Sequence, residues 1–207
     1  MASEELWRSA LHDLNNLMAG LQGVLDLSDP ERPLDPRNRL RLAATLEDGK
    51  GLIAMARALA LDRLPESGLA SWPDWAAGLR ERLDLMGELF RCPVELVGLR
   101  PGAEPWPTPL LQDWAAAFTR QILPWAAPGP LVLEAEASAE AWALRWITDA
   151  PMPRALLPDP PPDAPRNLAS IWLRAMAGRL AIEVEAGSGH LLARLPRAAS
   201  GPEALFR

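Results

Sequence analysis

The stretch from Ser9 to Leu21 reads Ser-Ala-Leu-His-Asp-Leu-Asn-Asn-Leu-Met-Ala-Gly-Leu, and it decides how the first part of the chain folds. It lies inside an amphipathic segment that runs from about Ser3, the expected N-cap, to Leu27. Apolar side chains recur there at alternating spacings of four and three residues, at Trp7, Leu11, Leu14, Met18, Leu21 and Leu25. This spacing lines them up along one side of a helix and is typical of a coiled-coil-like seam. The sequence therefore predicts a long helix that packs against other helices.

A second helix is expected after a short break. Three prolines fall within residues 28–36, and proline cannot sit inside a helix, so the first helix must end there. A second helical pattern runs from about Arg37 to Arg63. Two helices of similar length joined in this way form an antiparallel hairpin. Because one hairpin cannot bury both of its faces, we expect two copies to form a homodimeric four-helix bundle.

The rest of the sequence mixes helical and strand patterns. Helices are expected over residues 75–90, 110–125 and 167–176, and strands over residues 94–97, 131–135, 141–147, 180–185 and 191–195. Gly187, Ser188 and Gly189 fit the turn of a closing hairpin. The predicted fold class is α+β, with a helical hairpin over residues 1–66, an α/β sandwich over residues 72–197 and a tail over residues 198–207.

Composition and charge restrict the kinds of binding partner and the cellular compartment that fit this chain. The net charge of -6 argues against nucleic acid or an anionic membrane surface as the main partner. The single cysteine, Cys92, excludes an internal disulfide and fits a reducing compartment. No apolar run approaches the roughly 20 residues of a membrane-spanning helix, and the acidic start of the chain is unlike a signal peptide. We expect a cytoplasmic protein that binds neither nucleic acid nor membrane.

His12 is the residue with the most suggestive surroundings, because a carboxylate and two amides follow it directly. Histidine titrates near neutral pH, so its free ring nitrogen can act as a nucleophile in the cell. Asp13 can hold the other ring nitrogen and stabilise the charge that develops during attack. Asn15 and Asn16 can orient a phosphoryl group or a hydrolytic water. His12 is thus a candidate phosphoryl acceptor, and the plainer alternative is an exposed histidine on a solvated helix face.

Small residues follow His12 on its side of the helix. Asn16, Ala19 and Gly23 lie within roughly 40° of His12 around the axis, because each residue turns by about 100°. A nearly bare face of this kind lets a partner helix approach closely while the histidine projects into the partner's site. We therefore expect Asn15, Ala19 and Gly23 to contact a partner protein.

Residues 9–21 resemble the H-box of two-component sensor histidine kinases, in its His-Asp-Leu-Asn-Asn form. The hairpin resembles the dimerisation and phosphotransfer domain of that family. This resemblance implies that His12 is the phosphorylated residue, Asp13 its acid/base partner and Asn16 the residue that helps to dephosphorylate the partner. The later segment is similar to the family's ATP-binding domain, with residues 110–123 at the asparagine-bearing helix and Asp149 at the nucleotide-binding aspartate.

The segment over residues 72–197 departs from the family pattern at the positions where nucleotide would bind. Gln121 stands in place of the expected magnesium-binding asparagine. Ala150-Pro151-Met152-Pro153 replaces the glycines after Asp149, and proline offers no N–H group to a phosphate. Residues 158–163 are mainly proline where the family has a glycine-rich lid. The sequence therefore indicates a degenerate ATP-binding domain with no cofactor or metal of its own.

Together these features resemble the ChpT-type histidine phosphotransferases, dimeric bacterial proteins that relay phosphoryl groups to or from response-regulator receiver domains. In such a phosphorelay the receiver supplies the Mg²⁺. Two alternatives stay open: a noncatalytic pseudo-histidine-kinase that acts as a dimeric scaffold for a regulator, and a residual histidine kinase or phosphatase. Phosphotransferase chemistry is favoured over ATP-dependent kinase activity.

The other chemically notable residues have structural explanations. His190 falls in a predicted turn, and Cys92 lacks the neighbours of a metal site, so they are expected at the surface and in the core. Tryptophans at helical or strand spacing favour core packing over a ligand platform, at Trp72, Trp75, Trp106, Trp114, Trp125, Trp142, Trp146 and Trp172.

Overall fold

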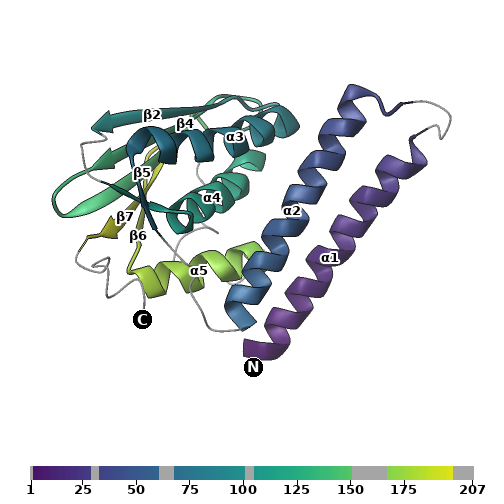
Figure 1. Cartoon of the computed structure of the whole chain (residues 1–207), viewed down its shortest axis with the longest axis horizontal. Helices are drawn as coiled ribbons and strands as arrows, with labels where there is room; N and C mark the ends of the chain where they lie inside the picture. Colours follow the sequence, from purple (N-terminus) through teal and green to yellow (C-terminus); the bar gives the residue numbers. More distant parts are fainter. Residues whose placement is uncertain (1, 29–32, 61–67, 101–104, 151–166, 198–207) are drawn as a thin grey trace. The chain divides into compact units, whose positions relative to one another are not determined.

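The computed structural model describes residues 2–28, 33–60, 68–100, 105–150 and 167–197. The chain forms two compact units. Figure 1 labels its helices and strands and colours them along the sequence. The first unit consists of residues 1–63 with residues 165–172, and the second of residues 64–164 with residues 173–207. The fold class is α+β, as predicted, with helices at the N-terminus followed by a mixed sheet.

Two helices of 25 residues each dominate the first unit, α1 (Ala2–Asp26) and α2 (Pro36–Ala60), and they lie side by side (Figure 1). Asp35 caps the start of α2. Its Oδ1 accepts the backbone N–H of Asn38 at 2.8 Å, which satisfies one of the free donors of the first turn. Both predicted helices are therefore confirmed. The predicted end of the second helix at Arg63 lies outside the described residues.

Small residues allow α1 and α2 to approach closely. A Cβ atom added to Gly49 would lie 2.9 Å from Leu17 Cδ1, and one added to Gly20 would lie 3.7 Å from Thr45. Val24 of α1 and Ala44 of α2 are buried beside these contacts. The hairpin thus closes on a face of α1 that is different from the predicted apolar seam.

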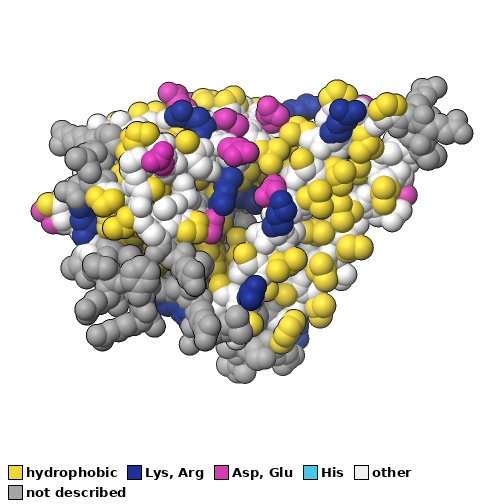
Figure 2. Space-filling model, viewed as in Figure 1, with side chains coloured by type: hydrophobic (Ala, Val, Ile, Leu, Met, Phe, Trp, Pro, Cys, Tyr) yellow, Lys and Arg dark blue, Asp and Glu magenta, His cyan; other side chains and the backbone are white. Residues whose placement is uncertain are grey.

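The predicted seam of α1 remains largely exposed. Trp7 is 63% exposed and Leu25 is 66% exposed, and Leu11, Leu14 and Met18 are also exposed. Leu46 and Ile53 of α2 are exposed as well. Figure 2 shows hydrophobic side chains gathered along the hairpin. The single chain therefore leaves an apolar face of its hairpin uncovered.

A five-stranded sheet forms the framework of the second unit, in the order β2-β4-β5-β7-β6. The β2–β4 pair is parallel, and the β4–β5, β5–β7 and β7–β6 pairs are antiparallel. In the register, Leu133 lies opposite Trp146 and Leu144 lies opposite Ala193, so large apolar side chains share one face. The strands are β2 (Val94–Arg100), β4 (Leu131–Ala137), β5 (Ala141–Ile147), β6 (Glu183–Gly187) and β7 (His190–Pro196).

Helices α3 (Trp72–Phe90) and α4 (Leu110–Ala126) cover the apolar face of this sheet (Figure 1). The Trp146 indole N–H donates to Thr119 Oγ1 of α4 at 2.8 Å, while its ring packs against Phe118 at a centroid distance of 4.7 Å. Aromatic packing and a satisfied indole donor together fix the sheet against α4. The third helix, α5 (Leu168–Leu180), begins in the first unit and continues in the second.

The structure corrects several local expectations. Trp125 is 54% exposed in the last turn of α4, so its assignment to the core was wrong. Leu180 ends α5 instead of beginning a strand, because Ala181 takes a left-handed conformation (φ 52°) that stops the helix before β6. The predicted turn at Ser188 and Gly189 is confirmed, with Gly189 at a φ of 73°.

A short two-stranded sheet was missed by the sequence analysis. Strands β1 (Gly68–Ala70) and β3 (Trp106–Thr108) pair in antiparallel fashion. Pro107 lies within β3, and proline normally argues against a strand because it lacks an N–H donor. In a sheet of only two strands each strand pairs on one side, so the missing donor is tolerated.

Cys92 and the tryptophans mostly behave as expected. Cys92 is fully buried, its thiol donates to the Gly129 carbonyl at 2.9 Å, and burial raises its pKa. The buried tryptophans are Trp75, Trp106, Trp114, Trp142, Trp146 and Trp172.

Among the described residues no helix is long and apolar enough to cross a bilayer.

Candidate functional site

His12 projects from the first half of α1 into solvent. Its side chain is 69% exposed, whereas the side chain of the neighbouring Asp13 is only 15% exposed. The adjacent positions differ because successive residues turn by about 100° around the axis. The imidazole is therefore open to a partner molecule, while the carboxylate beside it is largely shielded from water.

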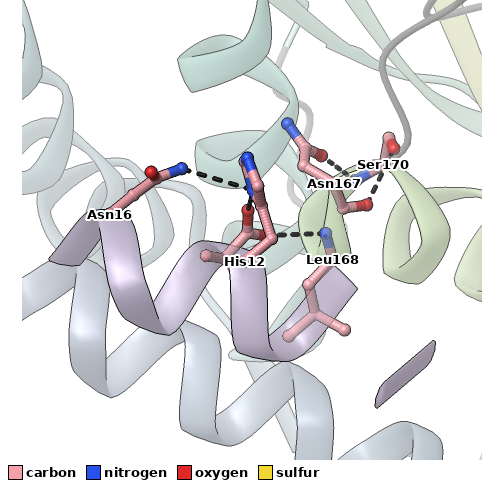
Figure 3. A network of polar contacts seen from close by, with 6 residues as sticks. His12, Asn16, Asn167, Leu168 and Ser170 are labelled. Carbon is pink, nitrogen blue, oxygen red and sulfur yellow. Dashed lines mark hydrogen bonds and ion pairs between the residues drawn. The ribbon is translucent and has the colours of Figure 1, made fainter. Parts of the chain in front are cut away.

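Two side chains contact the same nitrogen of His12. Its Nδ1 lies 3.0 Å from Asp13 Oδ1 and 3.3 Å from Asn16 Nδ2. Figure 3 shows the Asn16 amide directed towards the His12 ring. A protonated Nδ1 can donate to the carboxylate, whereas an unprotonated Nδ1 can only accept from the amide. The shorter, charge-assisted contact with Asp13 favours Nδ1–H. Exchanging the oxygen and nitrogen of the Asn16 amide then turns the second contact into an accepting one.

The Nδ1–H form leaves the other ring nitrogen, Nε2, with a free lone pair. Among the described residues Nε2 has no hydrogen-bond partner. A neutral imidazole held in this way is a nucleophile at Nε2, and the nearby carboxylate stabilises the positive charge that the ring acquires on attack. The geometry therefore suits group transfer to Nε2.

The second oxygen of Asp13 has a partner that the sequence analysis missed. The backbone N–H of Leu168, at the start of α5, donates to Asp13 Oδ2 at 2.8 Å (Figure 3). Asn167 caps this helix, because its Oδ1 accepts the Ser170 N–H at 2.8 Å. The sequence signals the cap through an asparagine before a helical pattern. It gives no signal that this first turn lies beside residue 13, about 155 positions away in the chain.

The expected partner-contacting residues lie along the same helix without touching His12. Asn15 and Ala19 are exposed, and a Cβ atom added to Gly23 would meet nothing within 4 Å. The structure therefore brings Asp13 and Asn16 to His12 and leaves Asn15, Ala19 and Gly23 as an open strip. Their role in partner binding stays a prediction.

The residues expected at a nucleotide site belong to the second unit. Gln121 is half-buried on α4, and Asp149 is exposed just after β5. The proline-rich loop over residues 151–165 lies outside the described residues. Within the described part of the chain, no group of three or more His, Cys, Asp or Glu side chains is placed to hold a metal ion.

The fold is similar to that of solved histidine kinases. The Acinetobacter baumannii histidine kinase AdeS superposes with a TM-score of 0.56 at 15% identity, over 92% of this chain and 96% of that chain. A bacterial phosphotransferase gives a TM-score of 0.52 at 12% identity, over 93% of this chain and 94% of that one. The catalytic domain of histidine kinase ThkA gives 0.50 at 7% identity, over 64% of this chain and 96% of that domain.

Sequence comparison adds no closer relative. No protein-family model matches the chain, and no curated protein is significantly similar to it. At these low identities the structural likeness establishes a histidine-kinase-like fold, which extends over both the hairpin and the α/β unit. At these identities the structural likeness assigns no role to His12, Asp13 or Asn16.

Proposed function

We propose that this chain is a histidine phosphotransfer protein that relays phosphoryl groups to or from receiver-domain aspartates. The observation that carries the proposal is the state of His12, whose imidazole is exposed while its Nδ1 is held by Asp13 at 3.0 Å. The fold is similar to that of the histidine kinase AdeS over 92% of this chain. An exposed, oriented imidazole on a helical hairpin suits transfer between proteins.

In the forward step, the lone pair of His12 Nε2 attacks the phosphorus of a receiver's aspartyl phosphate. The new Nε2–P bond forms as the P–O bond to the aspartate breaks, and the receiver's carboxylate leaves with the electron pair. The Nδ1 proton stays on the ring, where Asp13 balances the positive charge. Mg²⁺ bound by the receiver would neutralise negative charge on the phosphoryl oxygens. Reversal of these steps phosphorylates another receiver.

The open strip beside His12 fits a helix of the receiver. Ala19 and Gly23 present little or no side chain, so a partner helix can approach the backbone of α1 closely. Asn15 is also exposed, about one turn further along α1. Docking along this strip carries the aspartyl phosphate to Nε2.

The exposed apolar face of the hairpin supports a homodimer. Trp7, Leu11, Leu14 and Met18 repeat at spacings of four and three, and all four are exposed in the single chain. Burying a large apolar side chain contributes about 1.5–3 kcal/mol. A second copy with the same face covers this seam and completes a four-helix bundle.

The nucleotide-site substitutions support phosphoryl transfer from a protein rather than from ATP. Gln121 replaces a magnesium-binding asparagine, and prolines at positions 151 and 153 replace residues whose N–H groups would meet phosphate. The proposed relay therefore needs no cofactor bound by the chain itself.

The test is incubation of the purified protein with receiver domains carrying radiolabelled aspartyl phosphate. Wild-type protein should take up label that is stable to alkali and labile to acid, as a phosphohistidine is. His12→Ala should take up none, whereas His190→Ala should label like wild type. Label that persists in His12→Ala would refute the proposal.

Two further results would point to the alternatives. A receiver that binds wild type and His12→Ala equally, with no label on either protein, would favour the noncatalytic scaffold. Magnesium-dependent ATP binding in calorimetry, with labelling of His12 by ATP, would favour a residual kinase.

A further inference from the structure

The two carboxylate oxygens of Asp13 contact two different groups. Oδ1 lies 3.0 Å from His12 Nδ1, and Oδ2 accepts the Leu168 N–H at 2.8 Å. The carboxylate thus contacts both the imidazole and the first N–H group of α5. Its side chain is only 15% exposed, so water competes weakly for either oxygen.

We propose that the first turn of α5 is a positioning element for His12, acting through Asp13. The Leu168 N–H fixes the carboxylate so that Oδ1 faces Nδ1, and this holds the imidazole in its Nδ1–H tautomer with Nε2 free to attack. The proposal rests on the proposed phosphotransfer function and adds a group 155 positions along the chain that controls it.

The effect follows from how histidine tautomers are set. The hydrogen bond made by one ring nitrogen decides which nitrogen carries the proton. Without a second anchor, an Asp side chain can rotate to other rotamers in which Oδ1 no longer faces Nδ1. The helix N-terminus adds a favourable dipole for the anion as well as a donor. Removing the Leu168 N–H should therefore allow the His12 ring to adopt the Nε2–H tautomer while the fold stays intact.

Asn167 prepares the donor. By accepting the Ser170 N–H at 2.8 Å, its side chain caps the third residue of the helix and leaves the first N–H, that of Leu168, for Asp13. Leu168 therefore occupies the first helical position, where proline is well tolerated because its N–H is not used within the helix. Asn167, the residue before it, acts as the N-cap, and N-cap residues typically have the extended backbone that a following proline prefers.

This position allows the donor to be deleted selectively. Leu168→Pro removes the N–H, and Leu168→Ala keeps it; both variants lose the buried leucine side chain. A second pair acts on the cap. Asn167→Ala removes the capping oxygen, and Asn167→Ser restores one, since serine caps helices about as well as asparagine.

The readouts are the ¹⁵N chemical shifts of the His12 ring at mildly alkaline pH and the initial rate of label uptake from a phospho-receiver. In Leu168→Pro the ring should shift towards the Nε2–H tautomer, and uptake should be about tenfold slower than in Leu168→Ala. Asn167→Ala should slow uptake about threefold, and Asn167→Ser should restore it.

Each outcome separates this inference from the proposed function. Equal tautomer ratios and equal rates in Leu168→Pro and Leu168→Ala would overturn the positioning role while leaving phosphotransfer intact. If wild type accepts no phosphoryl group, the proposed function fails, and the ring shifts alone decide the positioning role. If Leu168→Pro does not fold, the Asn167 pair decides, and equal ring shifts in its two variants would overturn the inference.

Discussion

The two units of this protein differ in how completely their large apolar side chains are buried. The second unit buries Trp114, Trp146 and Phe118 almost completely between α4 and the sheet. The hairpin of the first unit leaves Trp7 and Leu25 about two-thirds exposed. The second unit therefore carries its own complete core. The hairpin leaves an apolar face uncovered in the single chain, and the exposed His12 lies on one of its two helices.

The largest expected effect tests the core of the second unit. Trp146→Ala removes a fully buried ring and the hydrogen bond to Thr119, and should cost about 3–5 kcal/mol of unfolding free energy. Urea unfolding followed by circular dichroism, with alkylation of the buried Cys92 as a local probe, measures this. The control Trp125→Ala, at an exposed position, should change stability by less than about 0.5 kcal/mol. Equal costs for the two variants would contradict the assigned core.

The second prediction separates chemistry from stability. In Asp13→Asn the amide oxygen can still accept the Leu168 N–H, but the amide nitrogen then faces His12 Nδ1 as a donor. The imidazole must respond with the Nε2–H tautomer, which has no lone pair for attack. Phosphoryl uptake should fall about 100-fold with little change in stability. Asp26→Asn, also on α1 and bonded to Gln22, is the matched control and should label normally.

The third prediction tests whether the hairpin is completed by a second copy. Leu14→Glu puts a charge into the apolar seam and should weaken dimerisation about tenfold to 100-fold, as measured by sedimentation equilibrium. Leu99→Glu, at a similarly exposed leucine of β2 (47% against 45%), should leave the dimer unchanged. A wild-type protein that is monomeric at high micromolar concentration would contradict the prediction.

The smallest expected effect compares two glycines in the hairpin. A Cβ atom added to Gly23 or Gly51 meets nothing within 4 Å, so Gly23→Ala and Gly51→Ala should each stabilise their helix by up to about 1 kcal/mol. Thermal melting by circular dichroism measures this. Larger side chains then separate the two sites: Gly23→Leu should slow phosphoryl uptake by blocking the receiver, whereas Gly51→Leu should not. Similar uptake rates would argue against docking at the strip beside His12.

Much of the fold could be predicted from the sequence because the signals are local. Apolar spacing revealed α1, prolines placed the break, and alternation revealed strands such as β5, which runs from Ala141 to Ile147 as expected. The short strand β3 was missed because Pro107 is a breaker signal, and Trp125 was misplaced because spacing alone does not show which face of a helix is covered.

The contacts of Asp13 with His12 and of Asn16 with His12 were also predictable, since they join residues one and four positions apart on a helix. The sequence by itself determined the helical hairpin, the position of His12 and the residues beside it. Only the tertiary structure decided that the α1 seam stays open while Leu17 packs against Gly49 of α2, and that the Leu168 N–H donates to Asp13. Periodicity and neighbouring side chains are properties of a local stretch of chain. The choice of packing face, and a hydrogen bond across 155 positions, arise only when distant segments come together.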